Sequence, residues 1–143
     1  MDGISEILAT YNCVSLDEKI QFELDGVVEK EIKQAYCIEN LEFCVSCMDY
    51  TTLKVSDTEE SVKNFTADLL KKLKKFNLRD VAAVCVFSNY AGIVREGLKG
   101  TEIQTAVVAG NFPNSQTFTE IKLAECKMAI GAGAQEVDVV ISV

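Results

Sequence analysis

From about residue 41 onward, short apolar runs alternate with longer segments in which apolar residues recur every three or four positions. The apolar runs lie near residues 43–48, 81–87, 103–109 and 137–143. Short unbroken apolar runs are typical of parallel strands that are covered on both faces, whereas the longer period is typical of helices that bury one face. The alternation therefore predicts an α/β fold built on a parallel sheet.

Helical patterns fill the segments between the apolar runs. They cover about residues 56–76, 89–98 and 117–132. Residues 1–40 also show helical spacing, with many charges on the opposite face, and they contain no comparable apolar run. These patterns predict two domains, a helical N-terminal extension over residues 1–40 and an α/β domain over residues 41–143.

The spacing of the strands favours one kind of α/β fold. The predicted strands begin about 31 residues apart, and eight such units give about 250 residues, the usual size of a (β/α)8 barrel. We therefore expect the N-terminal half of a TIM barrel, strands 1–4, with an unpaired edge at the fourth strand. A dinucleotide-binding fold is the competing interpretation, but the pair Gly131 and Gly133 closes a predicted helix instead of following the first strand.

Charge limits the class of partner. The chain has 22 acidic and 14 basic residues and a net charge of −8, which argues against nucleic acid or an anionic membrane as the main partner. A phosphorylated small molecule stays compatible, because backbone N–H groups can bind phosphate locally. The N-terminus shows no secretory signal, and no apolar run approaches the roughly 20 residues of a membrane span. We therefore expect a cytoplasmic protein.

The cysteines predict neither a metal site nor a redox site. The chain has six cysteines and no histidine. Cys44 and Cys47 form a C-x-x-C pair, but they lie in the first predicted strand, where an odd separation directs side chains to opposite faces. A structural zinc site needs a second such pair, which the sequence lacks. We expect reduced cysteines that are mostly buried, with no bound metal.

Four residues near the predicted strand ends are candidates for chemistry. Asp49 and Thr51 follow the first predicted strand, Cys85 is late in the second, and Asp138 is within the fourth. Ligands of α/β proteins bind beyond the carboxyl ends of parallel strands. A carboxylate inside a covered strand is unfavourable unless it is paired, so Asp138 indicates a function. For Asp49, a plain turn after the strand is the alternative interpretation.

Four stretches together resemble a known family. They are Cys47–Leu53, Ala82–Phe87, Val107–Pro113 and Leu123–Val140, and in order and spacing they resemble deoxyribose-phosphate aldolase. The resemblance covers about residues 41–143. It implies a TIM-barrel class I aldolase that cleaves 2-deoxyribose 5-phosphate to acetaldehyde and glyceraldehyde 3-phosphate in deoxyribonucleoside catabolism. It also implies a reaction through a Schiff base on a lysine, without metal or other cofactor.

The resemblance also implies a role for each candidate residue. Asp138 matches the acidic member of the proton relay, and Asp49 matches the acidic residue near the reacting centre. Thr51 matches a hydroxyl that binds sugar oxygens, and Cys85 matches a thiol close to the substrate. The implied partners are small phosphorylated sugars and aldehydes.

Some features of the family have no counterpart in this sequence. The Schiff-base lysine, its partner lysine and the glycine-rich phosphate loops belong to later strands of the barrel, so we expect these 143 residues to be inactive alone. Lys54 lies in a loop that the family does not use for catalysis, and Ser88 stands where many members have proline.

Two further hypotheses come from other functional classes. In the first, the chain is a non-catalytic half-barrel, and two copies pair their open edges in a homodimer. In the second, it is a small-molecule-binding α/β module unrelated to aldolases.

Overall fold

The computed structural model describes residues 6–7, 9–10 and 13–142, with side chains described for 6–7, 9–10 and 18–142. The contacts within the chain divide it into two units, Met1–Leu41 and Glu42–Val143. The first unit contains helix α2 (Cys13–Val27), a π-helical segment (Val28–Ile32) and helix α3 (Lys33–Ala35). Helix α4 (Ile38–Ser46) spans the boundary between the units. No helix in the described part of the chain is long and apolar enough to cross a membrane.

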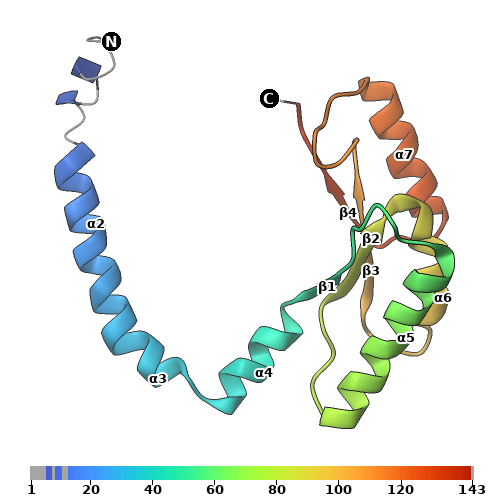
Figure 1. Ribbon diagram of the computed structural model, residues 1–143, viewed down its shortest axis with the longest axis horizontal. Coiled ribbons are helices and arrows are strands. Elements are labelled where there is room, and N and C mark those ends of the chain that lie inside the picture. Colours follow the sequence, from blue (N-terminus) through green and yellow to red (C-terminus); the bar gives the residue numbers. More distant parts are fainter. Residues whose placement is uncertain (1–5, 8, 11–12, 143) are drawn as a thin grey trace. The chain divides into compact units, whose positions relative to one another are not determined.

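The second unit is a parallel sheet with helices on one side. In the described residues, strands β1 (Asp49–Thr51), β2 (Ala83–Phe87), β3 (Gln104–Ala109) and β4 (Glu136–Val139) form one sheet in sequence order. Helices α5 (Glu59–Phe76), α6 (Ala91–Gly97) and α7 (Thr119–Gly131) connect successive strands and lie on the same side of the sheet (Figure 1). The predicted α/β fold with a parallel sheet is confirmed.

The prediction of the first strand is wrong in position. Residues 43–46 lie in helix α4, and the strand is the later segment Asp49–Thr51. The apolar run from Phe43 to Val45 is too short for its period to distinguish a strand from a helix. A strand forms only where the backbone can pair with β2, beginning with Asp49 opposite Ala83. Asp49 therefore begins a strand instead of following one.

The prediction that the cysteines are mostly buried is also wrong. Among the described cysteine side chains, Cys85 is buried and Cys126 is half-buried, whereas Cys37, Cys44 and Cys47 are exposed. Cys44 lies in α4 and Cys47 directly follows that helix, so the strand geometry assumed for this pair does not apply.

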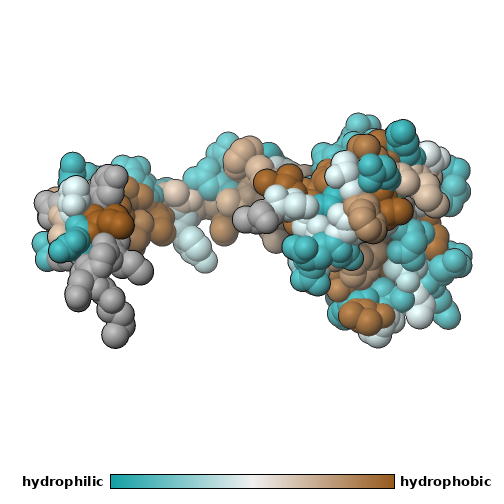
Figure 2. All heavy atoms as spheres, turned by 90° about the horizontal axis from the view of Figure 1, so that it is seen from above, coloured by the Kyte–Doolittle hydropathy of each residue, from teal (hydrophilic) through white to brown (hydrophobic). Residues whose placement is uncertain are grey.

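The main core lies between the sheet and its helices. Alternate residues of β2 and β3, including Val84, Val86 and Val107, are completely buried there. From the helices, Val62 and Leu69 of α5 and Val94 of α6 pack in the same cluster, with Leu98, which directly follows α6. Other apolar residues are exposed, and Figure 2 shows apolar and polar side chains mixed on the face in view. The residues of β2 and β3 that point the other way form a smaller cluster of Ala83, Cys85, Ala106 and Val108.

One polar side chain in the main core has no hydrogen-bond partner. The Oγ1 atom of Thr105, in β3, is buried and unpaired among the described residues. A buried hydroxyl without a partner lowers stability by about 1–3 kcal/mol.

Thr105→Val is therefore expected to raise the free energy of unfolding by about 1 kcal/mol, measured by urea denaturation. As the control, Thr66→Val removes a buried hydroxyl that donates to the Val62 carbonyl at 3.0 Å. Equal effects of the two substitutions would contradict this explanation.

Candidate functional site

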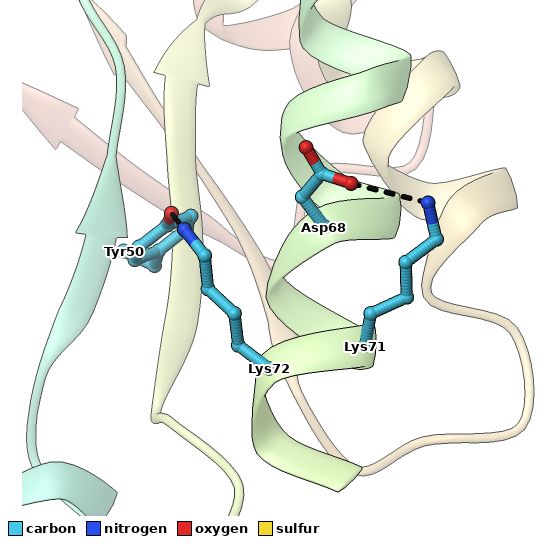
Figure 3. A network of polar contacts seen from close by, with 4 residues as sticks. All are labelled: Tyr50, Asp68, Lys71 and Lys72. Carbon is cyan, nitrogen blue, oxygen red and sulfur yellow. Dashed lines mark hydrogen bonds and ion pairs between the residues drawn. The ribbon is translucent and has the colours of Figure 1, made fainter. Parts of the chain in front are cut away.

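The side chain of Tyr50 shows which way strand β1 faces. Its ring stacks on Phe65 of helix α5 with ring centroids 4.2 Å apart, and Lys72 Nζ donates a hydrogen bond to its hydroxyl at 3.2 Å (Figure 3). Neighbouring residues of a strand point to opposite faces. Asp49 and Thr51 therefore lie on the face of the sheet that is turned away from the helices, which we call the inner face.

The strand register brings the other candidates to the same face. Thr51 pairs with Cys85, and Cys85 pairs with Ala106. Asp138 pairs with Val108, which belongs to the small cluster on the inner face. All four candidate residues, from three of the four strands, therefore share the inner face.

The pKa of the Cys85 thiol reflects the burial and the charges on this face. Burial is the largest of the effects that raise its pKa, which reaches about 11. The carboxylates of Asp138 and Asp49 raise the pKa further, and a hydrogen bond with Thr51 lowers it. At neutral pH the thiol is therefore uncharged, and it is a weak nucleophile because the thiolate is the reactive form.

Removing one of these carboxylates should make Cys85 more reactive. Asp138→Asn removes a negative charge that opposes ionisation, so the pKa of Cys85 is expected to fall. Below the pKa, each half-unit fall raises the thiolate fraction about threefold. The measurement is the alkylation rate of the Cys85 peptide at pH 8 to 9, followed by mass spectrometry. Glu102→Gln removes an equal charge from an exposed position that is not among the groups acting on Cys85, and it should leave the rate unchanged. An unchanged rate in Asp138→Asn would show that the two side chains do not interact.

Asp138 is in a different environment from the one expected. It is exposed, because β4 is an edge strand and no described residue of the second unit covers the inner face above it. The expectation of a carboxylate inside a strand covered on both faces is therefore wrong for these residues. The evidence for a role of Asp138 is its place on the inner face, where its charge acts on Cys85, and not its burial.

The strands bring only acidic charges to the inner face. Alternation and register place Asp49, Glu136 and Asp138 there, and none of the residues in the four described strands is basic. Lys54 lies beyond β1, where its backbone N–H donates to an Asp57 carboxylate oxygen at 2.9 Å. No group of three or more potential metal ligands is found among the described residues.

Helix α7 contributes a carboxylate that the sequence analysis assigned no role. One oxygen of Glu125 accepts a hydrogen bond from Ser88 Oγ at 2.8 Å, and the other accepts one from the Gly110 N–H at 2.9 Å. Ser88 follows β2 and Gly110 follows β3. Glu125 therefore connects the segments beyond the carboxyl ends of the two central strands. The only sequence signal for it was its place in the stretch that resembles the aldolase family.

Lys122, which also lies on α7, was not identified as a functional or structural residue from the sequence. Its side chain is buried, with 9% exposed, and Nζ donates to Ser115 Oγ, to the Val140 carbonyl at 3.1 Å and to Ser142 Oγ at 3.0 Å. Three acceptors match the three donors of an ammonium group. These hydrogen bonds hold the segment after β4 against α7 and against the loop after β3. A helical pattern alone gives no signal for a buried lysine, since its partners lie in loops.

A mostly apolar pocket of about 670 Å³ lies elsewhere in the second unit. It is lined by Ser88 and Asn89 and by residues of the segment Ile121–Ala132. Glu125 connects this pocket with the strand ends, but the pocket contains none of the four candidate residues.

Comparisons with known proteins support the resemblance. No protein-family model matches the chain. The deoxyribose-phosphate aldolase of Clostridium novyi is 44% identical over 96 residues, which cover 67% of this chain and 40% of that enzyme. The enzyme of Bos taurus is 35% identical over 136 residues, covering 85% of this chain and 41% of that enzyme. The chain thus spans about two fifths of the length of these curated relatives.

Solved structures are similar to the same part of the fold. A putative deoxyribose-phosphate aldolase from Coccidioides immitis matches with a TM-score of 0.60 and 27% identity, over 71% of this chain and 37% of the other. A tetrameric deoxyribose phosphate aldolase from Aeropyrum pernix matches with a TM-score of 0.55 and 28% identity, over 68% and 38%. The predicted resemblance and the predicted partial barrel are confirmed.

Proposed function

We propose that this chain, whose relatives are deoxyribose-phosphate aldolases, supplies the acidic part of an active site for reversible cleavage of 2-deoxyribose 5-phosphate. The products would be acetaldehyde and glyceraldehyde 3-phosphate. The observation that carries the proposal is that Asp49, Thr51, Cys85 and Asp138 share the inner face and lie within the stretches that resemble the family. The register of the strands supports a common site for all four.

Each side chain suits a step of Schiff-base chemistry. A lysine must be neutral to attack a carbonyl, and it must release and regain protons as the imine forms and breaks. In our proposal Asp138 accepts and returns these protons through water. Asp49 is a second carboxylate near the reacting carbon, and the Thr51 hydroxyl binds a sugar oxygen. Cys85 stays protonated, since its pKa is about 11, and lines the site without competing as a nucleophile.

The lysine of this mechanism is proposed to come from outside the 143 residues. The inner face of the described strands offers carboxylates and no cation, so a lysine placed over it would meet opposite charges. We propose a cytoplasmic enzyme whose remaining barrel strands or partner chain supply the lysine and the phosphate site.

Borohydride trapping tests this proposal. The 143-residue chain incubated with acetaldehyde and borohydride is expected to gain no two-carbon adduct at a defined lysine. A chimera is the companion experiment, with residues 42–143 replacing the matched segment of the Clostridium novyi enzyme. It should be trapped at one lysine and should cleave 2-deoxyribose 5-phosphate. The same chimera with Asp138→Asn should lose most of its activity, by about 10²–10⁴-fold for a proton-transfer residue. Adduct formation at a single lysine of the short chain, such as Lys54, would overturn the assignment.

The proposal does not extend to a homodimer closed around a shared interior. Such a dimer would bring Asp49, Glu136 and Asp138 of both copies together, and like charges facing each other are unfavourable. The charges of the inner face therefore do not favour the alternative of a non-catalytic half-barrel that self-assembles.

A further inference from the structure

The turn that ends helix α4 contains two exposed thiols three residues apart, Cys44 and Cys47. The Cys47 N–H donates to the Cys44 carbonyl at 3.1 Å, and the Met48 N–H donates to the Val45 carbonyl at 3.1 Å. These are bonds between residues three apart, the pattern of a 3₁₀ turn, in which side chains three apart eclipse each other. Both thiols are exposed.

This geometry reverses the expectation for the pair. In a strand, Cys44 and Cys47 would point to opposite faces, and no chemistry between them would follow. In the turn that ends α4 they project to the same side. A disulfide requires Cβ atoms about 4 Å apart. Helical residues three apart have Cβ atoms about 5–6 Å apart, so the turn must tighten by about 1–2 Å when the bond forms.

We propose that Cys44 and Cys47 form a redox-active dithiol that a peroxide or a low-molecular-weight disulfide converts to an intramolecular disulfide. With hydrogen peroxide, one thiolate attacks an oxygen, giving a sulfenic acid and releasing the other oxygen as water. The second thiol attacks the sulfenic sulfur, the S–S bond forms, and a second water leaves. Two thiols lose two electrons and two protons, and one peroxide becomes two waters.

The other described cysteines are less suited to this chemistry. Cys85 is buried and its pKa is about 11, so it forms little thiolate. Cys126 is half-buried in helix α7. Cys37 is exposed but precedes Cys44 by seven residues. The pair also directly precedes β1, which begins with Asp49, so a disulfide would fix the turn through which the chain enters that strand. This inference is independent of the proposed aldolase function.

The test uses the reduced 143-residue chain and oxidised glutathione, with intact mass and peptide mapping. A mixed disulfide formed on one thiol of the pair should be displaced by the other. We expect a product that has lost two hydrogens, contains a Cys44–Cys47 link and keeps no glutathione at these positions. Stable glutathione on both residues, or a link from either residue to Cys37, would overturn the proposal.

Two variants test whether the disulfide forms because the two thiols are close together, and not only because they are exposed. Cys47→Ser should retain glutathione on Cys44, because no neighbouring thiol can displace it. The double variant Cys47→Ser with Ser46→Cys restores the number of thiols but sets them two residues apart, where helical side chains do not face each other. It should also retain glutathione. If the double variant forms an internal disulfide as fast as the natural pair, the turn geometry is not the cause and the proposal fails.

Discussion

Replacing Lys122 by alanine is expected to lower the free energy of unfolding by about 2–4 kcal/mol. The change removes the ammonium donor that the Val140 carbonyl, Ser115 Oγ and Ser142 Oγ share. Ser115 is buried, and a buried polar group that loses its partner costs about 1–3 kcal/mol. Ser142 is exposed, and the Val140 carbonyl still accepts a hydrogen bond from Ser115 Oγ at 3.0 Å. The substitution also removes the packing of the aliphatic stem. Relief from burying an ammonium group offsets part of this loss. Urea denaturation followed by circular dichroism measures the difference.

Lys127 provides the matched control. It lies on the same helix and is exposed, so Lys127→Ala should change the free energy of unfolding by about 0.5 kcal/mol or less. Lys122→Met keeps most of the stem and should be less destabilising than Lys122→Ala. If Lys122→Ala and Lys127→Ala unfold at the same urea concentration, the hydrogen bonds of Lys122 do not hold the segment after β4 in place.

Replacing Leu98 by alanine is expected to lower the free energy of unfolding by about 2–5 kcal/mol, the usual range for a fully buried leucine. Leu98 is 0% exposed and is among the largest completely buried side chains of the second unit. Its removal leaves a cavity between α6 and the sheet that rigid neighbours fill only in part. The midpoint of urea unfolding should fall with little change in the slope of the transition.

Leu123→Ala is the control for the cavity. This leucine is on α7 and is 54% exposed, so its truncation should cost less than about 1 kcal/mol. Similar losses for the two leucines would mean that Leu98 is not held in a close-packed core.

The parts of the fold that the sequence predicts well are those in which local pattern and tertiary environment agree. Strands β2 and β3 are apolar runs buried on the helix side, and their observed bounds differ by at most two residues from the predicted ones. The run from Phe43 to Val45 is also apolar, but it has no strand to pair with and lies in a helix. Which apolar run becomes a strand depends on pairing between distant segments, and the periodicity of the sequence carries no information about that pairing.

The same distinction applies to the site. Asp49, Thr51, Cys85 and Asp138 could be found from the sequence because strand alternation places side chains on a face without knowledge of loops. The exposure of Asp138 could not be found, since it depends on which strand forms the edge. The contacts of Lys122 and Glu125 could not be predicted, because their partners lie in the segments between the main helices and strands, up to 37 residues away.

The contact between Ser88 and Glu125 has a consequence for how these positions evolve. The resemblance to the aldolase family implies a proline in many members at the position of Ser88, whose hydroxyl here donates to Glu125. A proline there would stiffen the loop but remove the donor, so the effect of Ser88→Pro depends on which residue occupies position 125. The two positions are therefore expected to show epistasis, and substitutions at one should be tolerated best when the other changes with it.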